Sequence, residues 1–565
     1  MGTLFSAFDI ARSGLQVAQI QLDVAGNNIA NVNKEGFSRQ RVELLTRVPV
    51  DLGFGQVGRG VRVGQIARLR EGFLDFAFRR QNHELGQSDV ESRAFQIVQD
   101  LFLEPTQNGF SGRLSQFFAA ATEFSNNVES IPVRQSLLSE GQALADSLRQ
   151  LTTQLADLRT DANAQIISTV AEINSIATRI DELNHDIVAQ EVGNTVASAL
   201  RDERDLQLDR LSKLASINVR ELTDGSISVL IGNSELVSLS GARQFVALAN
   251  PALDPERPDF VEVRDASTNA LIDVQGGELS GALNVRDNIL TSIDSNLDTM
   301  AAALIQQVNG IHSQGNGLQN LSGTTTGGNA VTSAATPLVS AGLPFAVTAG
   351  SFNVVVYDNA GVPTTTAINI AAATTLNGLA TALDAVANLN ASVTPEGRLQ
   401  ISSAAGFTYS FANDSSGAVS ALGVNGFFTG FDARTIGINQ ALVENPALVS
   451  SSFSSDVLST GDNGAALAIA NVQAAKFLDG GLSTVGQFYQ NVITELGVDA
   501  RTVEQTRDQQ VILVDNFNRR RQEVSGVNID EEVTALLQFQ RAFEASARVI
   551  TTVDRMLETL LNTAL

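Results

Sequence analysis

Residues 528–560 read NIDEEVTALLQFQRAFEASARVITTVDRMLETL, and this stretch decides the fold. Its apolar side chains alternate at spacings of three and four, which is the seam of a heptad repeat on an α-helix. The seam consists of Leu536, Phe539, Phe543, Ile550, Val553, Leu557 and Leu560, with Ser546 as its one polar member. Asn528 with Glu531 three residues later has the spacing of a capping box. Asp530, Glu531 and Glu532 add the negative charge that a helix N-terminus favours.

A second such helix is predicted at the other end of the chain, over about residues 5–31. Its seam follows the same alternation and consists of Ala11, Leu15, Ala18, Leu22, Ala25 and Ile29. The helix is expected to end before Gly36. A single amphipathic helix cannot bury its own seam, so the two terminal helices must pair with each other, with other copies of the chain, or both.

The chain between these helices changes character several times, and we predict an α+β multidomain protein. Its expected parts are a discontinuous coiled-coil core made by the terminal helices, a long helical stalk and inserted, mainly β outer domains. Leucines and isoleucines at helical spacing predict the stalk over 85–216, and alternating β-branched residues predict strands over 217–280 and 343–430. A helix is expected near 376–389, and the chain is expected to remain helical after about 461. The predicted domains are 1–41 with 525–565 (terminal core), 42–216 with 282–312 and 441–524 (stalk), 217–281 (β domain), 313–342 (flexible linker) and 343–440 (outer β or αβ module).

Composition excludes several classes of function. The chain is 43% apolar and 17% charged, as folded proteins are, and its formal net charge of −24 disfavours a nucleic-acid partner. It has no cysteine, hence no disulfide or thiolate metal site. No apolar stretch is long enough for membrane insertion, and no signal peptide precedes the first helix. These features alone indicate a cytosolic protein, although a protein exported without cleavage would show the same features.

Six arginines lie close together in the sequence: Arg59, Arg62, Arg68, Arg70, Arg79 and Arg80. We interpret their side chains as solvated or ion-paired, and contact between subunits is the alternative.

No motif in the chain assembles a catalytic, metal or cofactor site. Residues 53–58 match G-x-G-x-x-G, but a strand-like alternation follows instead of the helix that a dinucleotide site needs, so we predict a glycine-rich hairpin. His83, His185 and His312 are far apart and lack metal-ligand spacing. Arg201 and Asp205 are interpreted as an i,i+4 ion pair on a helix. We therefore expect no enzyme activity and no cofactor.

The flanks of the terminal helices resemble the signatures of the flagellar rod, hook and hook-associated protein family. At the N-terminal end the matching residues are Asn27, Asn28, Asn31, Gly36, Phe37, Ser38, Arg39 and Gln40. At the C-terminal end they are Ser525, Gly526, Val527, Asn528, Asp530, Glu531 and Glu532. This segment leads into the last helix, and it is most similar to the corresponding segment of the hook-associated members. Asp202 to Asp205, with Leu208, Leu211 and Ser212, resemble a further segment of those members. Gly26 and the Lys34-Glu35 pair depart from the common pattern.

The resemblance implies a structural, secreted subunit of the extracellular flagellum. The terminal helices would line the inner core of a ring or tube at the hook–filament junction, after export through the flagellar type III apparatus without a cleaved signal peptide. The implied partners are other copies of the chain, the hook protein, hook-associated protein 3 and an export chaperone. A hook or distal rod protein is the alternative within the family, and a secreted adhesin or binding protein is the alternative outside it.

Overall fold

The computed structural model describes residues 2–51, 55–102, 104, 109–192, 195–453 and 461–564. The chain divides into two compact units that are each discontinuous in sequence. Unit 1 contains residues 1–93, 160–285 and 502–565, and unit 2 contains residues 94–159 and 286–501.

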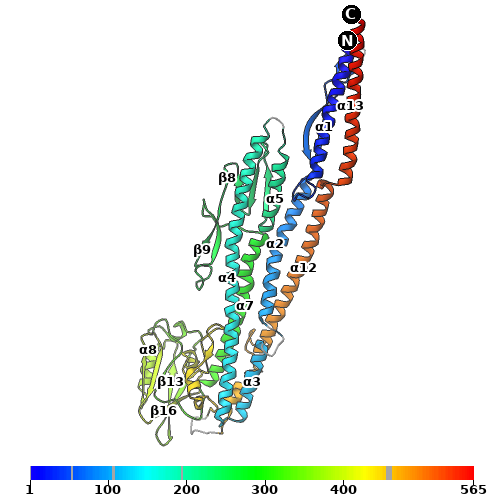
Figure 1. The fold of residues 1–565 in the computed structure, drawn as a ribbon. Coiled ribbons are helices and arrows are strands. Elements are labelled where there is room, and N and C mark those ends of the chain that lie inside the picture. The colour runs from blue at the N-terminus through cyan, green and yellow to red at the C-terminus, as the bar shows by residue number, and fades with distance from the viewer. Residues whose placement is uncertain are drawn as a thin grey trace. The chain divides into compact units, whose positions relative to one another are not determined.

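Unit 1 holds both ends of the chain. Its helices, or parts of helices, are α1 (Gly2–Ala30), α2 (Gly72–Phe102), α4 (Ile131–Gln190), α5 (Ser198–Leu214), α6 (Gly277–Asn284), α12 (Val485–Ser525) and α13 (Ile529–Ala564). Its strands are β1 (Gln40–Thr46), β2 (Val50–Asp51), β3 (Gln56–Val57), β4 (Val61–Arg68), β5 (Ile217–Glu221), β6 (Ile227–Ile231), β7 (Ser234–Ser238), β8 (Gly241–Ala242), β9 (Phe245–Ala249) and β10 (Val261–Asp265). Helices α1 and α13 run side by side, with the two chain ends at the same end of the pair (Figure 1).

The strands of unit 1 form small antiparallel sheets. Strands β5 to β8 make a four-stranded meander, in which β5 and β6 are joined by the predicted turn at Asp224-Gly225, with Gly225 at φ +86°. Strand β1 pairs with β4, and β2 pairs with β3. Of the G-x-G-x-x-G stretch (53–58), Gln56 and Val57 form β3, and residues 53 and 54 lie outside the described part. No helix follows its glycines, because residues from Val61 onward continue as strand β4.

Unit 2 combines a helical layer with two three-stranded sheets. Its remaining helices are α3 (Phe110–Asn126), a π-helical turn (Val285–Ile289, of which Val285 belongs to unit 1), α7 (Leu290–His312), α8 (Leu376–Asp384), α9 (Ala418–Ala421), α10 (Gln440–Glu444) and α11 (Gly464–Asn471), with 3₁₀ turns at Leu338–Ser340 and Pro446–Leu448. Its strands are β11 (Thr324–Thr326), β12 (Gly350–Tyr357), β13 (Pro363–Ile370), β14 (Leu389–Val393), β15 (Leu399–Ser403), β16 (Thr408–Ala412), β17 (Phe428–Thr429) and β18 (Gly437–Ile438). The sheets have the orders β13-β12-β16 and β11-β15-β14.

The helical stalk and the inserted sheets confirm the predicted fold class. Helix α4 runs for 60 residues from Ile131 without interruption, with Pro132 in its first turn, where the missing N–H costs nothing. Its predicted apolar positions are buried, for example Leu144, Leu148 and Ile180 at 0% exposure.

Three segments differ from expectation. Residues 313–342, expected as a linker, contribute strand β11 and bury Val331 and Leu338. Helix α8 ends at Asp384 and not near 389, because Asn388 takes a left-handed φ of +65° before strand β14. Residues 472–484 are not helical, since Gly480 and Gly481 have positive φ between α11 and α12.

Candidate assembly site at the paired chain ends

Helix α1 packs against α13, and its predicted seam positions are largely shielded from solvent. On α1 the alanines Ala11, Ala18 and Ala25 are buried, while Leu15, Leu22 and Ile29 are half-buried. Val17 and Val24, which flank the seam, are also buried. The small alanine side chains allow α13 to approach α1 closely.

Gly14 on α1 explains the polar member of the α13 seam. A Cβ built on Gly14 would lie 3.0 Å from Ser546 Oγ, so the helices meet where one residue has no side chain and the other a short one. A larger apolar residue at 546 would have to displace α1.

Burial along α13 follows the heptad spacing but is incomplete. Val553 is 5% exposed, and the seam positions from Leu536 to Leu557 are otherwise half-buried, whereas Leu560 remains 49% exposed. Six further large apolar side chains of this helix are also exposed: Ile529, Val533, Leu537, Val549, Met556 and Leu561. Scattered apolar residues are normal on protein surfaces, but seven on one 36-residue helix indicate a contact surface.

Asn28, in the middle of the N-terminal signature, ties three segments together. Its side chain is 1% exposed. Its Nδ2 donates to the carbonyl of Gln40 and to Glu532 Oε2, each at 3.0 Å, and its Oδ1 accepts from the backbone N–H of Gln40 at 3.0 Å. One amide therefore joins α1, the start of β1 and the first turn of α13.

Arg39 forms a second set of hydrogen bonds and ion pairs between the N-terminal and C-terminal signatures. Its Nε donates to Glu532 Oε1 at 2.6 Å and its Nη1 to Glu531 Oε2 at 2.7 Å, while its backbone N–H donates to the carbonyl of Ser525 at 2.8 Å. Partial burial by itself would lower the pKa of Arg39, but the two carboxylates outweigh it and raise that pKa. Glu532 is nearly buried and is neutralised by Arg39 within hydrogen-bond distance.

The C-terminal signature makes the tight turn between α12 and α13. Gly526 donates its N–H to the carbonyl of Gln522 at 2.8 Å, and a Cβ at this position would lie 2.3 Å from the same oxygen. Asn528 Oδ1 caps α13 by accepting from the N–H of Asp530 at 3.0 Å. The reciprocal half of the predicted capping box is replaced, because the Glu531 carboxylate binds Arg39.

The other signature residues surround this junction. Ser38 is buried, and its N–H donates to Asp202 Oδ2 at 3.1 Å. Asn31 Nδ2 donates to the backbone and side-chain oxygens of Asn27, both at 2.9 Å, on the exposed side of α1. Gly36 has φ +78°, which favours glycine, and packs against Leu206 of α5. Phe37 and Val527 are half-buried and line the groove described below.

Below the signatures, four arginines and four aspartates alternate in one ion-pair network. Its members come from β4 and the following loop, α2, α5 and α12, and their side chains are only 8–16% exposed. The network consists of Arg68, Arg70, Asp75, Arg79, Asp202, Asp205, Asp209 and Arg521.

Asp205 lies at the centre of this network. It meets Arg68 at 2.9 Å, Arg70 at 3.1 Å and Arg79 at 3.3 Å. Burial alone would raise the pKa of Asp205, but the three guanidinium charges outweigh it and lower the pKa to about 2. The prediction that Asp205 pairs with Arg201 is wrong. Arg201 instead binds Glu191 at 2.6 Å and Glu221 at 2.7 Å.

The predicted arginine cluster is therefore divided. Arg68, Arg70 and Arg79 neutralise aspartates within unit 1, as the ion-pair interpretation expects. Arg59, Arg62 and Arg80 are exposed and have no ion pair among the described residues.

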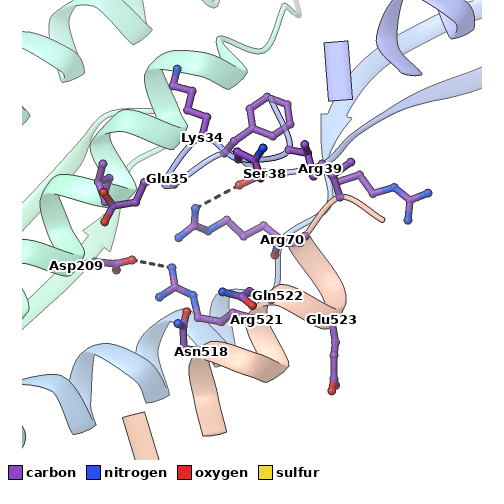
Figure 2. Close-up of a pocket in the computed structure, with 18 of the residues that line it drawn as sticks. Lys34, Glu35, Ser38, Arg39, Arg70, Asp209, Asn518, Arg521, Gln522 and Glu523 are labelled. Atoms are coloured by element: carbon purple, nitrogen blue, oxygen red, sulfur yellow. Dashed lines mark hydrogen bonds and ion pairs between the residues drawn. The ribbon is translucent and has the colours of Figure 1, made fainter. Parts of the chain in front are cut away.

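A groove of about 1360 Å³ opens beside the junction. It is lined by the signature turn, α5 and the end of α12, and Figure 2 shows Arg70 reaching Ser38 and Arg521 reaching Asp209 within it. Phe78 lies beneath Arg521, whose guanidinium carbon is 4.4 Å from the ring centroid. Arg70, Arg521 and Asp209, which line the groove, belong to the ion-pair network.

The histidines do not form a site. His185 is exposed, His83 lies 3.9 Å from Glu84, and His312 is fully buried in unit 2. Within the described residues, no three His, Cys, Asp or Glu side chains are grouped so that they could hold a metal ion. Over the same residues, no helix has both the length and the apolarity to cross a membrane.

Three family models match this chain. The N-terminal residues 8–37 match the flagella basal body rod protein model, and residues 520–563 match the flagellar basal body rod FlgEFG protein C-terminal model. Residues 95–329 match the helical domain of flagellar hook-associated protein FlgK.

Similar proteins extend over the whole chain. Flagellar hook-associated protein 1 of Bacillus subtilis is 25% identical over 594 aligned residues, covering 100% of this chain and 99% of its own. The protein of the same name from Salmonella typhimurium is 27% identical and covers 99% of each chain. The solved structure titled as the flagellar hook junction protein FlgK from Burkholderia pseudomallei has a TM-score of 0.51 at 19% identity, over 80% of this chain and 100% of that one, which supports the fold.

The chain combines paired terminal helices, the two signatures beside them, and nested helical and β units. Together with the matches at both chain ends, this combination defines a structural subunit of the bacterial flagellum. Within this class, the chain is similar over its whole length to flagellar hook-associated protein 1. The match over 95–329 favours this branch over the hook or distal rod proteins, and the comparisons give no support to a secreted adhesin.

Proposed function

We propose that this chain polymerises through α1 and α13 into a ring or tube at the hook–filament junction, where it adapts the hook to the filament. The observation that carries this proposal is the incomplete burial of α13. Its seam is covered on one side by α1, and its remaining apolar residues are exposed in the single chain. Further copies would remove this surface from water, at about 25 cal/mol for each Å² of apolar area.

The junction also supports this role. Asn28, Arg39 and Glu532 fix the base of the helix pair to the first turn of α13, so that both helices are presented as one unit. A rigid pair loses less conformational freedom on assembly than two separate helices would.

The location and the partners follow from the family. Relatives carry the name flagellar hook-associated protein 1, and the similar solved structure is titled a flagellar hook junction protein. By the sequence resemblance, the neighbours are the hook protein on one side and hook-associated protein 3 on the other. An export chaperone would hold the chain before export, which needs no cleaved signal peptide and places the subunit in the extracellular flagellum.

The test is Phe543→Asp, which places a charge in the half-buried seam. We expect the variant to be missing from isolated hook–basal-body particles and to restore no swimming to a strain that lacks its own copy. The reason is the cost of burying an unpaired carboxylate between helices, which is several kcal/mol.

The matched control is Gln538→Asp, which adds the same charge to the exposed face of α13. We expect this control to assemble and to support swimming. Normal assembly of Phe543→Asp would contradict the proposal. Because α1 of the same chain covers one side of the seam, the melting temperature of the monomer is measured as well; its collapse would show that Phe543 stabilises the monomer, and not contacts between copies.

A further inference from the structure

The segment that follows α1 forms a basic arm on an acidic chain. The arm, residues 40–68, of which 40–51 and 55–68 are described, contains the pair β1–β4; this pair packs against α1, where the N–H of Val61 donates to Ser13 Oγ at 3.2 Å. It carries five arginines against two carboxylates, whereas the whole chain has a net charge of −24.

One face of the arm is unpartnered. Successive side chains of a strand point to opposite faces. Val42 of β1 is buried, so Arg41 and Glu43 lie on the opposite, outward face; Leu45, beyond the register shift between Glu43 and Leu44, and Arg47, just after the strand, are exposed. Arg62 of β4 lies directly across from Leu45 in the register. Leu45 is 47% exposed, and the three arginines make no ion pair among the described residues.

Helix α12 carries a complementary face in the same unit. Glu504, Asp508, Ile512 and Asp515 follow one another at spacings of four, four and three, which places them on one side of a helix. All four are exposed, and Ile512 is 64% exposed. Asp508 has a single ion pair, with the adjacent Arg507 at 3.4 Å, and remains 65% exposed.

The two faces match in length as well as in charge. The seven residues from Arg41 to Arg47 span about 20 Å in extended conformation. The twelve residues of helix from Glu504 to Asp515 span about 17 Å. The arm face carries Arg41, Arg47 and Arg62 with Glu43 as its one carboxylate, and the helix face carries Glu504, Asp508 and Asp515 with Arg519 at its end, so the net charges of the two faces are opposite in sign. Strands β1 and β4 contact α1 of their own chain, and the exposed side chains of the arm are available to another copy.

We propose that the outward face of the arm binds the Glu504–Asp515 face of α12 in a second copy of this chain. The two faces are different surfaces of one molecule, so the contact is heterologous and builds a ring or a helical array instead of a closed dimer. The proposal rests on the proposed function, which it deepens by naming a second contact between copies. Because the charges are exposed, this contact determines which surfaces of two copies meet, and in which orientation, more than it adds to their affinity. The contact weakens as the salt concentration rises.

The first experiment uses the absence of cysteine from the chain. Leu45→Cys with Ile512→Cys, in a strain lacking its own copy, is treated with a bis-maleimide reagent in isolated hook–basal-body particles. We expect a ladder of multimers. The control pair Leu45→Cys with Leu239→Cys has an equally exposed second site in unit 1 and should give none. A ladder from the control pair alone, or from neither pair, would overturn the proposal.

The second experiment exchanges the charges. Arg41→Glu with Arg47→Glu and Arg62→Glu should lower the amount of protein in the particles, and so should Glu504→Lys with Asp508→Lys and Asp515→Lys. All six changes together should restore it, because the pairing is re-formed with reversed signs. Arm variants that assemble like the original chain, or six changes that fail to restore assembly while the monomer melts normally, would contradict the contact.

These outcomes are separable from failure of the proposed function. If the original chain is absent from the particles, the proposed function itself fails. If it is present and lost with Phe543→Asp, but neither the cross-link nor the charge exchange behaves as expected, only the arm contact is wrong.

Discussion

Two buried side chains, the guanidinium of Arg134 and the neutral imidazole of His312, hold one segment of unit 2 in place. Arg134 is 0% exposed and donates to the carbonyls of Val128 and Val449 and to Ser451 Oγ, with no carboxylate among these partners. His312 is equally buried. Its Nε2 accepts from the N–H of Ser450 at 3.0 Å, and its Nδ1 lies 2.9 Å from the carbonyl of Asn425, to which it donates. The 449–451 segment is thus bound from two sides by groups that have lost their hydration.

We predict that protonation of His312 makes unit 2 less stable in acid. Burial, with a smaller effect from the Arg134 charge, lowers the pKa of His312 from 6.5 to about 4. The unfolded chain binds this proton near pH 6.5 and the folded chain does not, so stability is full above pH 7 and falls as pH drops from 6.5 to 4. At 1.36 kcal/mol per pKa unit, the loss reaches about 3 kcal/mol.

The measurement is urea unfolding followed by tyrosine fluorescence, because all three tyrosines lie in unit 2. The control is His312→Gln, whose stability should change less between pH 7 and pH 4. Burial also raises the pKa of Asp298 to about 6, which acts in the opposite direction, so the difference between the two proteins is the quantity that isolates His312. Parallel pH profiles would contradict the assignment.

At the scale of elements, the entry to α13 depends on one close backbone contact. Gly526 follows α12 directly, and its missing side chain allows the chain to turn against Gln522 before Asn528 caps the next helix. The same region holds the bonds from Arg39 and Asn28, so a shift of this turn would also displace Glu531 and Glu532.

We predict that Gly526→Ala destabilises unit 1. The added Cβ would lie 2.3 Å from a backbone oxygen, which forces the turn to move, and changes of this kind cost more than about 1 kcal/mol. Gly26→Ala is the control, because Gly26 lies in α1 with nothing within 4 Å of its Cβ, and alanine there should stabilise by about 0.5–1 kcal/mol. Thermal unfolding followed by circular dichroism measures both. Equal effects of the two substitutions would show that the turn is not constrained.

The terminal helices could be predicted from the sequence because each seam is a local, periodic pattern. The apolar seam positions of α13 are buried or half-buried, and among them only Leu560, near the end, is exposed. The ion-pair network could not be predicted in the same way. Arg68 and Asp202 are 134 residues apart, Arg521 and Asp209 are 312 apart, and spacing does not choose among 61 acidic and 37 basic side chains. The Arg201–Asp205 error has this cause. The prediction assigned Asp205 a partner four residues away, whereas its partners Arg68, Arg70 and Arg79 are distant in the sequence.

At the scale of the whole molecule, the chain is nested, with its first and last segments in one unit and most of its middle in the other. The three tyrosines report on unit 2 alone, so the two units can be followed separately in one protein. Because α13 is the last element and packs mainly against α1, it can be removed without cutting through the core of either unit.

We therefore predict that deletion of residues 536–565 leaves a folded monomer that no longer assembles. The deletion removes the seam from Leu536 to Leu560 but keeps Glu531 and Glu532, so the bonds from Arg39 and Asn28 at the base remain available. Circular dichroism should show loss of helix confined to the deleted part and to α1, whose alanine seam loses its cover. The tyrosine-monitored unfolding of unit 2 should stay unchanged, and swimming should not be restored in a strain lacking its own copy. Normal swimming with the truncated chain would refute assembly through the helix pair, whereas a shifted unit 2 transition would show that the chain ends stabilise more of the monomer than their contacts with each other indicate.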